Sequence, residues 1–437
     1  MQKNISRREF VKTSAALSAA TMLSGGSGVF AAGSDKIRVG LIGCGQRGTG
    51  AAWDCAQSAP NVQIYALADV FQDKIKYTLN KFTKSDPSEA SEYLGGRLKD
   101  EQMDISPERC FVGFEAYRKV LATDVDLVIL AGPPHFRPRH LAAAVEAGKH
   151  VFMEKPAGVD PQGIRSVIKS SEIAQKKALA IVAGTQRRHQ NHYIEIMKRV
   201  RAGDIGKIVA AQCYWLWGET DWHLNKRQPG WSDMEWQLRS WPYFTWLSGD
   251  HIVEQHVHNL DVINWALGSH PVQCIAMGGR QVRTGLEYGN IFDHFAVEYE
   301  YPDGVRVASM CSQIEGTTNR ESERVVGTKG WVNTDAGNGS IEGQKPFIYD
   351  GTSPDPYIRE HAALIESIRR AEPINEGRKV AESTLTAIMG RMSAYTGRAI
   401  KWDWVMNASK LDLSPEKYEL GDLPVRPVAV PGKTRLV

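Results

Sequence analysis

Two acidic residues and a histidine recur at helical spacing within SGDHIVEQHVHNLDVINWALG, residues 248–268. Glu254, His258 and Asp261 stand at i, i+4 and i+7, so a helix would present them on one face. A carboxylate one turn from an imidazole can orient the ring and tune its pKa. His258 is therefore a candidate for proton transfer with Glu254 as its partner. An ion pair on a solvated helix face would show the same spacing, and the pattern leaves open whether His256 or His258 transfers the proton.

A lysine ends a second stretch, GKHVFMEKPAG, residues 148–158. An apolar run of the kind that forms a buried strand is followed by Glu154 and Lys155, and Pro156 then ends the strand. Lysine is rarely buried without a partner or a purpose. Its ammonium could polarise a hydroxyl or carbonyl oxygen of a ligand, which makes Lys155 a candidate catalytic residue.

The segment from Lys36 carries a glycine spacing that binds phosphate groups. A β pattern at 37–42 is followed by GCGQRG at 43–48 and then by an Ala-rich helical pattern. In this context the first glycine makes a tight turn, the second lets the backbone approach a pyrophosphate, and the third allows close helix–strand packing. The N–H groups at the helix start would hold the phosphates. The cofactor contacts expected here are Gly43, Gly45, Gln46, Arg47 and Gly48.

The next β pattern, 62–69, ends in an acidic residue 21 positions after Gly48. A carboxylate there accepts hydrogen bonds from ribose hydroxyls and repels a 2′-phosphate, so Asp69 favours NAD over NADP. A glycine loop that closes another α/β unit beside an incidental Asp would look the same. The other residues expected in the cofactor crevice are Pro133, His135, Glu154 and Lys155.

The order of the patterns predicts an α/β fold. Strand patterns at 125–134 and 149–156 enclose a helix pattern at 139–148, which indicates a doubly wound parallel sheet with ligands at the carboxyl ends of its strands. Later β patterns indicate a large, mostly antiparallel sheet, with a PDG hairpin turn between two of them. These patterns cover 209–217, 271–282, 292–300, 305–314 and 323–333. We predict an N-terminal Rossmann domain at 34–157, an α+β substrate domain at 158–403 and an extended arm at 404–437.

Composition limits the partners. The 437 residues are 42% hydrophobic and 24% charged, with a net charge of +3. Both signs are spread along the chain, so no basic stripe suggests nucleic acid. After residue 31 no apolar run approaches the ~20 residues of a membrane helix. The six cysteines lack metal-ligand spacing, so we expect no metal site.

The first 33 residues differ from the rest. SRREFVK at 6–12 places paired arginines ahead of a weakly apolar, Ala/Ser/Gly-rich stretch that ends in small residues. This order predicts a twin-arginine signal peptide and export of the folded chain to the periplasm. A disordered tail that contains two arginines is the alternative.

Seven of the twelve tryptophans lie between residues 215 and 246. Indole faces can stack on the apolar face of a pyranose while polar side chains bond its hydroxyls. Packing at a subunit interface would also favour tryptophan. The residues expected to contact a substrate are Lys155, Arg188, Trp236, Glu254 and His258.

Together VGLIGCGQRG, AGKHVFMEKP, GTQRRHQNHY with GDIGKI, and GDHIVEQHVHNLD resemble the Gfo/Idh/MocA oxidoreductases over about residues 36–400. The resemblance implies hydride transfer at a sugar or polyol carbon, with Lys155 touching both nicotinamide and substrate. Glu254 replaces the family's usual Asp, His256 replaces a Gly, and Arg137 stands where a His is common. It also implies that helices near 356–400 pack back on the first domain and that the chain forms a homodimer or homotetramer.

The resemblance and the export signal together predict an oxidoreductase that holds its NAD tightly, because the periplasm should offer no NAD pool. The reduced cofactor would be reoxidised in place. An alternative is an NAD-cycling glycoside hydrolase, which oxidises a sugar at C3, eliminates the aglycone, adds water and reduces the ketone again. A third is a non-catalytic sugar-binding protein that keeps the nucleotide fold.

Overall fold

Strands buried on both faces form the first of two sheets. β4 (Leu127–Leu130) is buried at every position and β1 (Ile37–Ile42) at nearly every position, as expected for a parallel sheet that helices cover on both sides. The computed structural model describes residues 36–84, 95–218 and 222–437. The predicted signal peptide lies outside these described residues.

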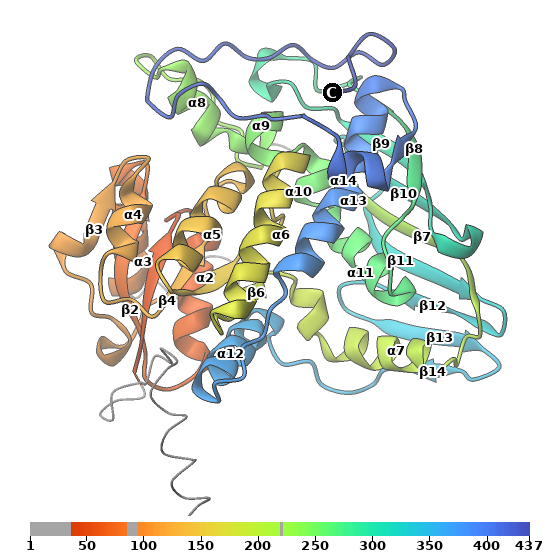
Figure 1. Ribbon diagram of the computed structural model, residues 1–437, viewed down its shortest axis with the longest axis horizontal. Coiled ribbons are helices and arrows are strands. Elements are labelled where there is room, and N and C mark those ends of the chain that lie inside the picture. The colour runs from red at the N-terminus through yellow and green to blue at the C-terminus, as the bar shows by residue number, and fades with distance from the viewer. Residues whose placement is uncertain (1–35, 85–94, 219–221) are drawn as a thin grey trace, which may run out of the picture. The chain divides into compact units, whose positions relative to one another are not determined.

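The first sheet has six parallel strands in the order β3-β2-β1-β4-β5-β6 (Figure 1). The other strands are β2 (Val62–Asp69), β3 (Cys110–Val112), β5 (His150–Met153) and β6 (Ile181–Ala183). Alternate residues of β4 pack into two hydrophobic cores, one on each face of the sheet. Leu127 and Ile129 share one with α2 (Gln46–Ser58), whereas Val128 and Leu130 share the other with α5 (Arg137–Glu146) and α6 (Pro161–Lys176). The helices α3 (Gln72–Thr83) and α4 (Ala116–Leu121) complete this α/β layer, so the predicted Rossmann fold is confirmed.

The second sheet is exposed on one face. β9 (His294–Glu300) alternates buried and exposed residues, which is typical of an antiparallel sheet with one face on a core. The order is β14-β13-β12-β11-β7-β10-β9-β8-β15, and only β7 and β10 pair in parallel. The remaining strands are β7 (Ile208–Trp217), β8 (Gln273–Gly279), β10 (Arg306–Gln313), β11 (Arg320–Gly327), β12 (Gly330–Thr334), β13 (Gly339–Gly343), β14 (Phe347–Ile348) and β15 (Ile400–Lys401). The PDG turn joins the antiparallel pair β9 and β10, as predicted.

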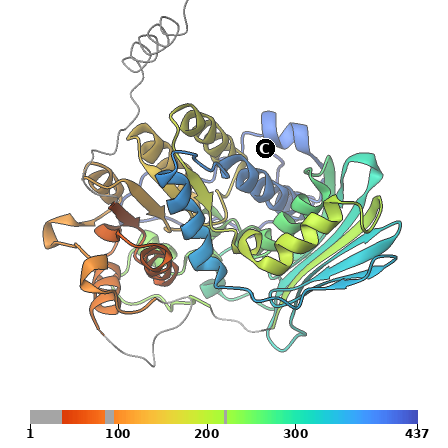
Figure 2. The same cartoon turned by 90° about the horizontal axis from the view of Figure 1, so that it is seen from below.

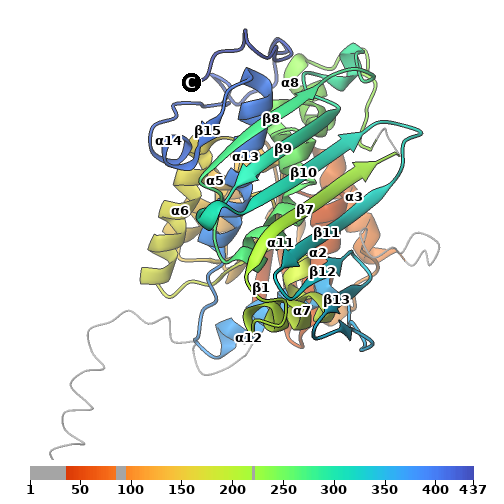
Figure 3. The same ribbon diagram turned by 90° about the vertical axis from the view of Figure 1, so that its right-hand side faces the viewer.

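Helices fill the space behind this sheet. Figure 3 looks onto its open face, with α11 (Val257–Leu267) and α13 (Gly377–Thr396) behind it. α13 packs against both β8 and α6, and α12 (Pro356–Arg369) packs along α2, which places the chain's late helices on the first sheet's layer (Figure 2). The other helices are α7 (Asn191–Arg201), α8 (Asp233–Arg239), α9 (Thr245–Ser248), α10 (His251–Glu254) and α14 (Trp402–Asn407). No helix in the described ranges is both long and apolar enough to cross a membrane.

Some predicted elements differ in the structure. The β pattern at 323–333 is a hairpin of β11 and β12, because Thr328 and Lys329 turn the chain between them. The helical pattern from Ile252 is interrupted between α10 and α11. β6 adds residues 181–183 to the parallel sheet. The predicted domain limits at 157 and 403 stay predictions. The segment after α14 packs on its own chain, since the Leu413 amide donates to Asp160 at 2.9 Å.

Candidate active site

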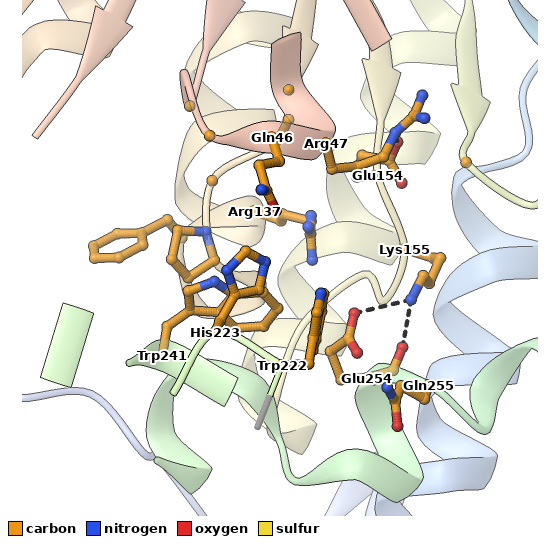
Figure 4. Close-up of a pocket in the computed structure, with 18 of the residues that line it drawn as sticks. Gln46, Arg47, Arg137, Glu154, Lys155, Trp222, His223, Trp241, Glu254 and Gln255 are labelled. Carbon is orange, nitrogen blue, oxygen red and sulfur yellow. Dashed lines mark hydrogen bonds and ion pairs between the residues drawn. The ribbon is translucent and has the colours of Figure 1, made fainter. Parts of the chain in front are cut away.

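A cavity of about 1160 Å³ opens at the carboxyl ends of the first sheet's strands, where ligands of doubly wound folds bind (Figure 4). Single-ligand pockets usually measure about 300–1,000 Å³, so this one has room for a dinucleotide and a small substrate together. Most of the residues predicted from the sequence line it. They are Gly43, Gly45, Gln46, Arg47, Gly48, Asp69, Pro133, Glu154, Lys155, Glu254 and His258.

The glycine loop has the shape that a pyrophosphate requires. Gly43 adopts a φ of +104°, which favours glycine, and a Cβ on Gly48 would lie 1.9 Å from the Gly43 oxygen. A Cβ on Gly45 would meet nothing within 4 Å, so the backbone there faces open space in the cavity. Gln46 then begins α2. The loop thus fits the phosphates of NAD, and each glycine has the role that its spacing predicts.

Hydrogen bonds and ion pairs hold the acidic residues beside this loop in place. The Asp69 carboxylate accepts the Cys44 amide at 2.7 Å and the Phe71 amide at 2.9 Å, which holds it at the end of β2. Arg47 pairs with Glu154 at 2.7 Å and with Asp54 at 2.8 Å. Glu154 therefore links the strand end before Lys155 to the glycine loop.

Lys155 lies in the cavity and is paired with Glu254. Its Nζ donates to the Glu254 carboxylate at 2.9 Å and to the Glu254 carbonyl at 2.6 Å (Figure 4). The predicted partnership of Glu254 with His258 is therefore wrong. The helix that should have aligned them breaks at Gln255 and His256, so Glu254 ends α10 while His258 lies in the first turn of α11.

The two candidate histidines have different surroundings. His258 lines the cavity and stacks on Trp215 with ring centres 5.9 Å apart. Burial, and then the charge of Lys155, hold the pKa of His258 well below its usual range, so its ring is neutral and able to accept a proton. His256 is fully buried, bonds Ser309 at 2.7 Å and does not line the cavity. Of the two, only His258 can therefore meet a ligand in the cavity.

Three predicted contacts lie outside the cavity lining. His135 is buried and bonds the Tyr418 hydroxyl at 2.8 Å. Arg188 forms a two-bond ion pair with Asp261, at 2.8 and 2.9 Å. Trp236 is a core residue, 8% exposed, whose Nε1 donates to the Asn225 carbonyl.

Other aromatic residues take the place predicted for Trp236. Trp222 and Trp241 line the cavity with ring centres 5.7 Å apart, and the His223 ring packs beside both, with its centre 4.5 Å from Trp222 and 6.3 Å from Trp241 (Figure 4). The density of tryptophan at 215–246 indicated that this segment lies at the substrate site. It could not signal which indoles face the cavity, because α8 buries its own tryptophan in a local core.

Comparison with known proteins follows the same division of the chain. An oxidoreductase model described as an NAD-binding Rossmann fold matches residues 37–184, and the GFO/IDH/MocA C-terminal domain matches residues 193–333. The chain belongs to the Gfo/Idh/MocA oxidoreductase family. It contains an NAD-binding Rossmann domain, in agreement with the prediction from the glycine loop and Asp69.

This member of the family is a distant relative of curated proteins. It is 27% identical to 2,7-anhydro-N-acetylneuraminate hydratase of Escherichia coli over 53% of the chain and 58% of that protein. It is 23% identical to inositol 2-dehydrogenase of Rhizobium meliloti over 74% of the chain and 81% of that protein. The chain thus spans little more than half the length of the hydratase.

Solved structures share the fold of the oxidoreductase. The aldose-aldose oxidoreductase from Caulobacter crescentus, complexed with glycerol, is 20% identical, with a TM-score of 0.63 over 84% of this chain and 99% of that one. A levoglucosan dehydrogenase in complex with NADH and levoglucosan is 15% identical, also with a TM-score of 0.63 over 84% and 99%. At these identities the likeness establishes the fold.

The position of Asp69 predicts how the oxidoreductase selects its nucleotide. Asp69→Asn removes the charge and keeps the size, so repulsion of a 2′-phosphate should fall and NADP affinity should rise by about tenfold or more. Calorimetric titration of nucleotide-stripped protein with NAD and NADP measures this. Asp73→Asn is the control, because Asp73 lies outside the cavity lining and is paired with Arg239. An unchanged NADP/NAD ratio in Asp69→Asn would contradict the role of Asp69.

A buried carboxylate behind the cavity predicts a large stability effect. Glu323 is 2% exposed and accepts bonds from Arg187 at 2.5 Å, Asn259 at 2.7 Å and Tyr193 at 2.9 Å. Arg187→Met would leave this carboxylate without its cation, at a cost of about 3–5 kcal/mol in the free energy of unfolding. Thermal and urea unfolding of the oxidoreductase measure the loss. The double variant Arg187→Met/Glu323→Gln should recover part of it, and equal losses would refute the charge explanation.

Proposed function

We propose that the protein is an NAD-dependent oxidoreductase acting on a secondary alcohol of a sugar, polyol or glycoside, with tightly bound NAD that is recycled in place. The arrangement of Lys155 carries this proposal. Its ammonium, held by Glu254, lies in the same cavity as the glycine loop, Asp69 and a neutral histidine. Oxidation of an alcohol needs these groups: a nucleotide site, a cation at the reacting oxygen and a base.

The side chains divide the reaction between them. His258 is neutral and accepts the hydroxyl proton at a ring nitrogen. The Lys155 ammonium stabilises the negative charge that develops on the same oxygen, and Glu254 fixes the ammonium in position. The glycine loop and Asp69 would hold NAD, which would supply a hydride acceptor and, once reduced, a hydride donor for a carbonyl. Trp222 and Trp241 offer faces for the apolar side of a sugar ring.

We also propose that the chain is exported to the periplasm by the twin-arginine route and works there as a homodimer or homotetramer. Paired arginines at 7–8 ahead of an Ala/Ser-rich stretch support export. Tight retention of NAD follows from such a location. Cell fractionation of the full chain and of an Arg7→Lys/Arg8→Lys variant tests export, because only the unaltered chain should reach the periplasm. Light scattering of the purified protein tests assembly.

A second function, NAD-cycling glycoside hydrolysis, is supported by the relatives. Besides the anhydro-sugar hydratase, a stretch of 148 residues is 29% identical to glycosyl hydrolase family 109 protein 1 of Bacteroides fragilis, over 34% of this chain and 28% of that protein. In this mechanism C3 is oxidised, the C2 proton is removed, the aglycone leaves, water adds and the ketone is reduced. Lys155 and His258 would serve the two redox steps.

One experiment separates these functions. Fresh protein is first characterised by its spectrum and by mass analysis of any released nucleotide, and it is then incubated with 4-nitrophenyl glycosides without added NAD. Nitrophenol release at catalytic turnover would favour the hydrolase. A keto-sugar that accumulates only when a second carbonyl acceptor is supplied would favour the oxidoreductase. Sugar binding with no change at 340 nm and no product would favour the non-catalytic alternative.

A further inference from the structure

We propose that Arg137 binds a carboxylate of the substrate, so that the substrate is an acidic sugar such as a uronic acid, an aldonic acid or a glycoside of one. This inference rests on the proposed function, because it assigns the substrate class of the same cavity. It depends on a buried guanidinium that has no ionic partner.

Arg137 is the first residue of α5, and its side chain reaches into the cavity. It is 5% exposed and extends among Gln46, Trp222 and His223 (Figure 4). Nη1 donates to the Pro156 carbonyl at 2.9 Å, whereas Nε has no partner and no hydrogen bond is found for Nη2. Nε is buried from solvent, so Nη2 is the nitrogen left to donate a charge-assisted hydrogen bond to a carboxylate in the cavity.

Three other cations that line the cavity pair with carboxylates. Arg47 pairs with Glu154 and Asp54, Lys155 with Glu254, and Arg187 with Glu321 and Glu323. Among the described residues no carboxylate lies within ion-pair distance of Arg137. Arg137 therefore differs from these three cations in having no carboxylate in direct contact.

A buried charge without a partner is costly, so a retained one indicates a ligand of opposite sign. Burial lowers the pKa of Arg137 to about 10, and the charges of Glu154 and Glu254 oppose the fall. At neutral pH the group is still a cation. An anion that enters with the substrate would give the guanidinium an ionic partner through Nη2.

The position of the guanidinium assigns this anion to the substrate rather than to the nucleotide. The bond to Pro156 ties Arg137 to the residue that follows Lys155, where the reacting oxygen would be held. The phosphates instead have the glycine loop and the start of α2. A carboxylate on Arg137 would thus lie near the reacting carbon and orient it relative to Lys155 and His258.

The test compares sugars that differ in one carboxylate. D-glucuronate, D-galacturonate and D-gluconate are titrated calorimetrically into the NAD-containing protein beside D-glucose, D-galactose and D-glucitol. We expect at least one acid to bind about 100-fold more tightly than its neutral counterpart. Arg137→Met should remove this difference with less than threefold change for the neutral sugar, and Arg137→Lys should keep part of it.

Two controls make the result specific. Arg320 is an exposed cation that also lines the cavity, so Arg320→Met tests whether a general positive field suffices. Thermal unfolding shows whether Arg137→Met folds, and its unliganded melting temperature should stay level or rise because an unpaired buried charge is removed. The proposal is overturned if no acid binds better than its counterpart, if Arg320→Met weakens acid binding equally, or if Arg137→Met releases NAD.

Absorbance at 340 nm with the same sugars separates this proposal from the proposed function. Acids that bind through Arg137 without any formation of NADH would sustain the carboxylate site and refute hydride transfer. Turnover of neutral sugars without any preference for acids would sustain the function and refute the carboxylate site.

Discussion

Lys155→Met is expected to lower the rate at which enzyme-bound NADH forms by about 10³-fold or more. The variant loses the cation that stabilises charge on the reacting oxygen, and one such preorganised donor is typically worth about 10²–10³-fold in rate, with loss of proton positioning in addition. Stopped-flow absorbance at 340 nm after mixing with the preferred sugar measures the effect. NAD content should be unchanged, because Asp69 and the glycine loop hold the nucleotide.

A paired variant distinguishes chemistry from folding. Lys155→Met leaves the Glu254 carboxylate, only 7% exposed, without its cation, so the melting temperature should also fall. Lys155→Met/Glu254→Gln removes both charges and should recover stability while the rate stays low. Recovery of the rate in the double variant, or a single variant within tenfold of the parent, would remove Lys155 from the mechanism.

The nucleotide half of the site was predictable because its signals are local. Gly43, Gly45 and Gly48 each do what their spacing requires, and Asp69 ends the neighbouring strand. Lys155 could be placed because any residue just beyond a parallel strand lies at the crevice. The rule needs only strand order, which the alternation of strand and helix patterns indicated.

The substrate half depends on contacts that spacing cannot show. Glu254 bonds Lys155, which is 99 positions away, because the helix breaks after α10. One predicted cofactor contact failed for the same reason: His135 bonds Tyr418, which lies 283 positions later in the chain, and does not line the cavity. Both errors come from tertiary structure, which supplies distant partners and interrupts the predicted helix after Glu254.

For the same reason, the sequence could not show which cations are free to bind a ligand. Arg188 was predicted to contact the substrate, but in the fold it forms an ion pair with Asp261. The sequence had placed Asp261 on the same helix face as His258. From the sequence, Arg137 stood only for a histidine that is common at this position of the family. In the described part of the fold it forms no ion pair with a carboxylate. Whether a cation is available for a ligand depends on the carboxylates that the fold places beside it, as Arg188 and Arg137 show.

His258→Gln is expected to reduce NADH formation by about 10²–10⁴-fold, the usual contribution of a positioned base. His256→Gln is the matched control and should keep activity in molecules that fold, because His256 does not line the cavity. The pH dependence adds a sharper test. Burial and Lys155 hold the pKa of His258 well below 6.5, and the neutral ring is the proton-accepting form, so the rate should stay level as pH falls through 6.5 and decline only in more acidic solution. A wild-type rate that halves near pH 6.5 would contradict a His258 whose pKa is held low by burial and Lys155.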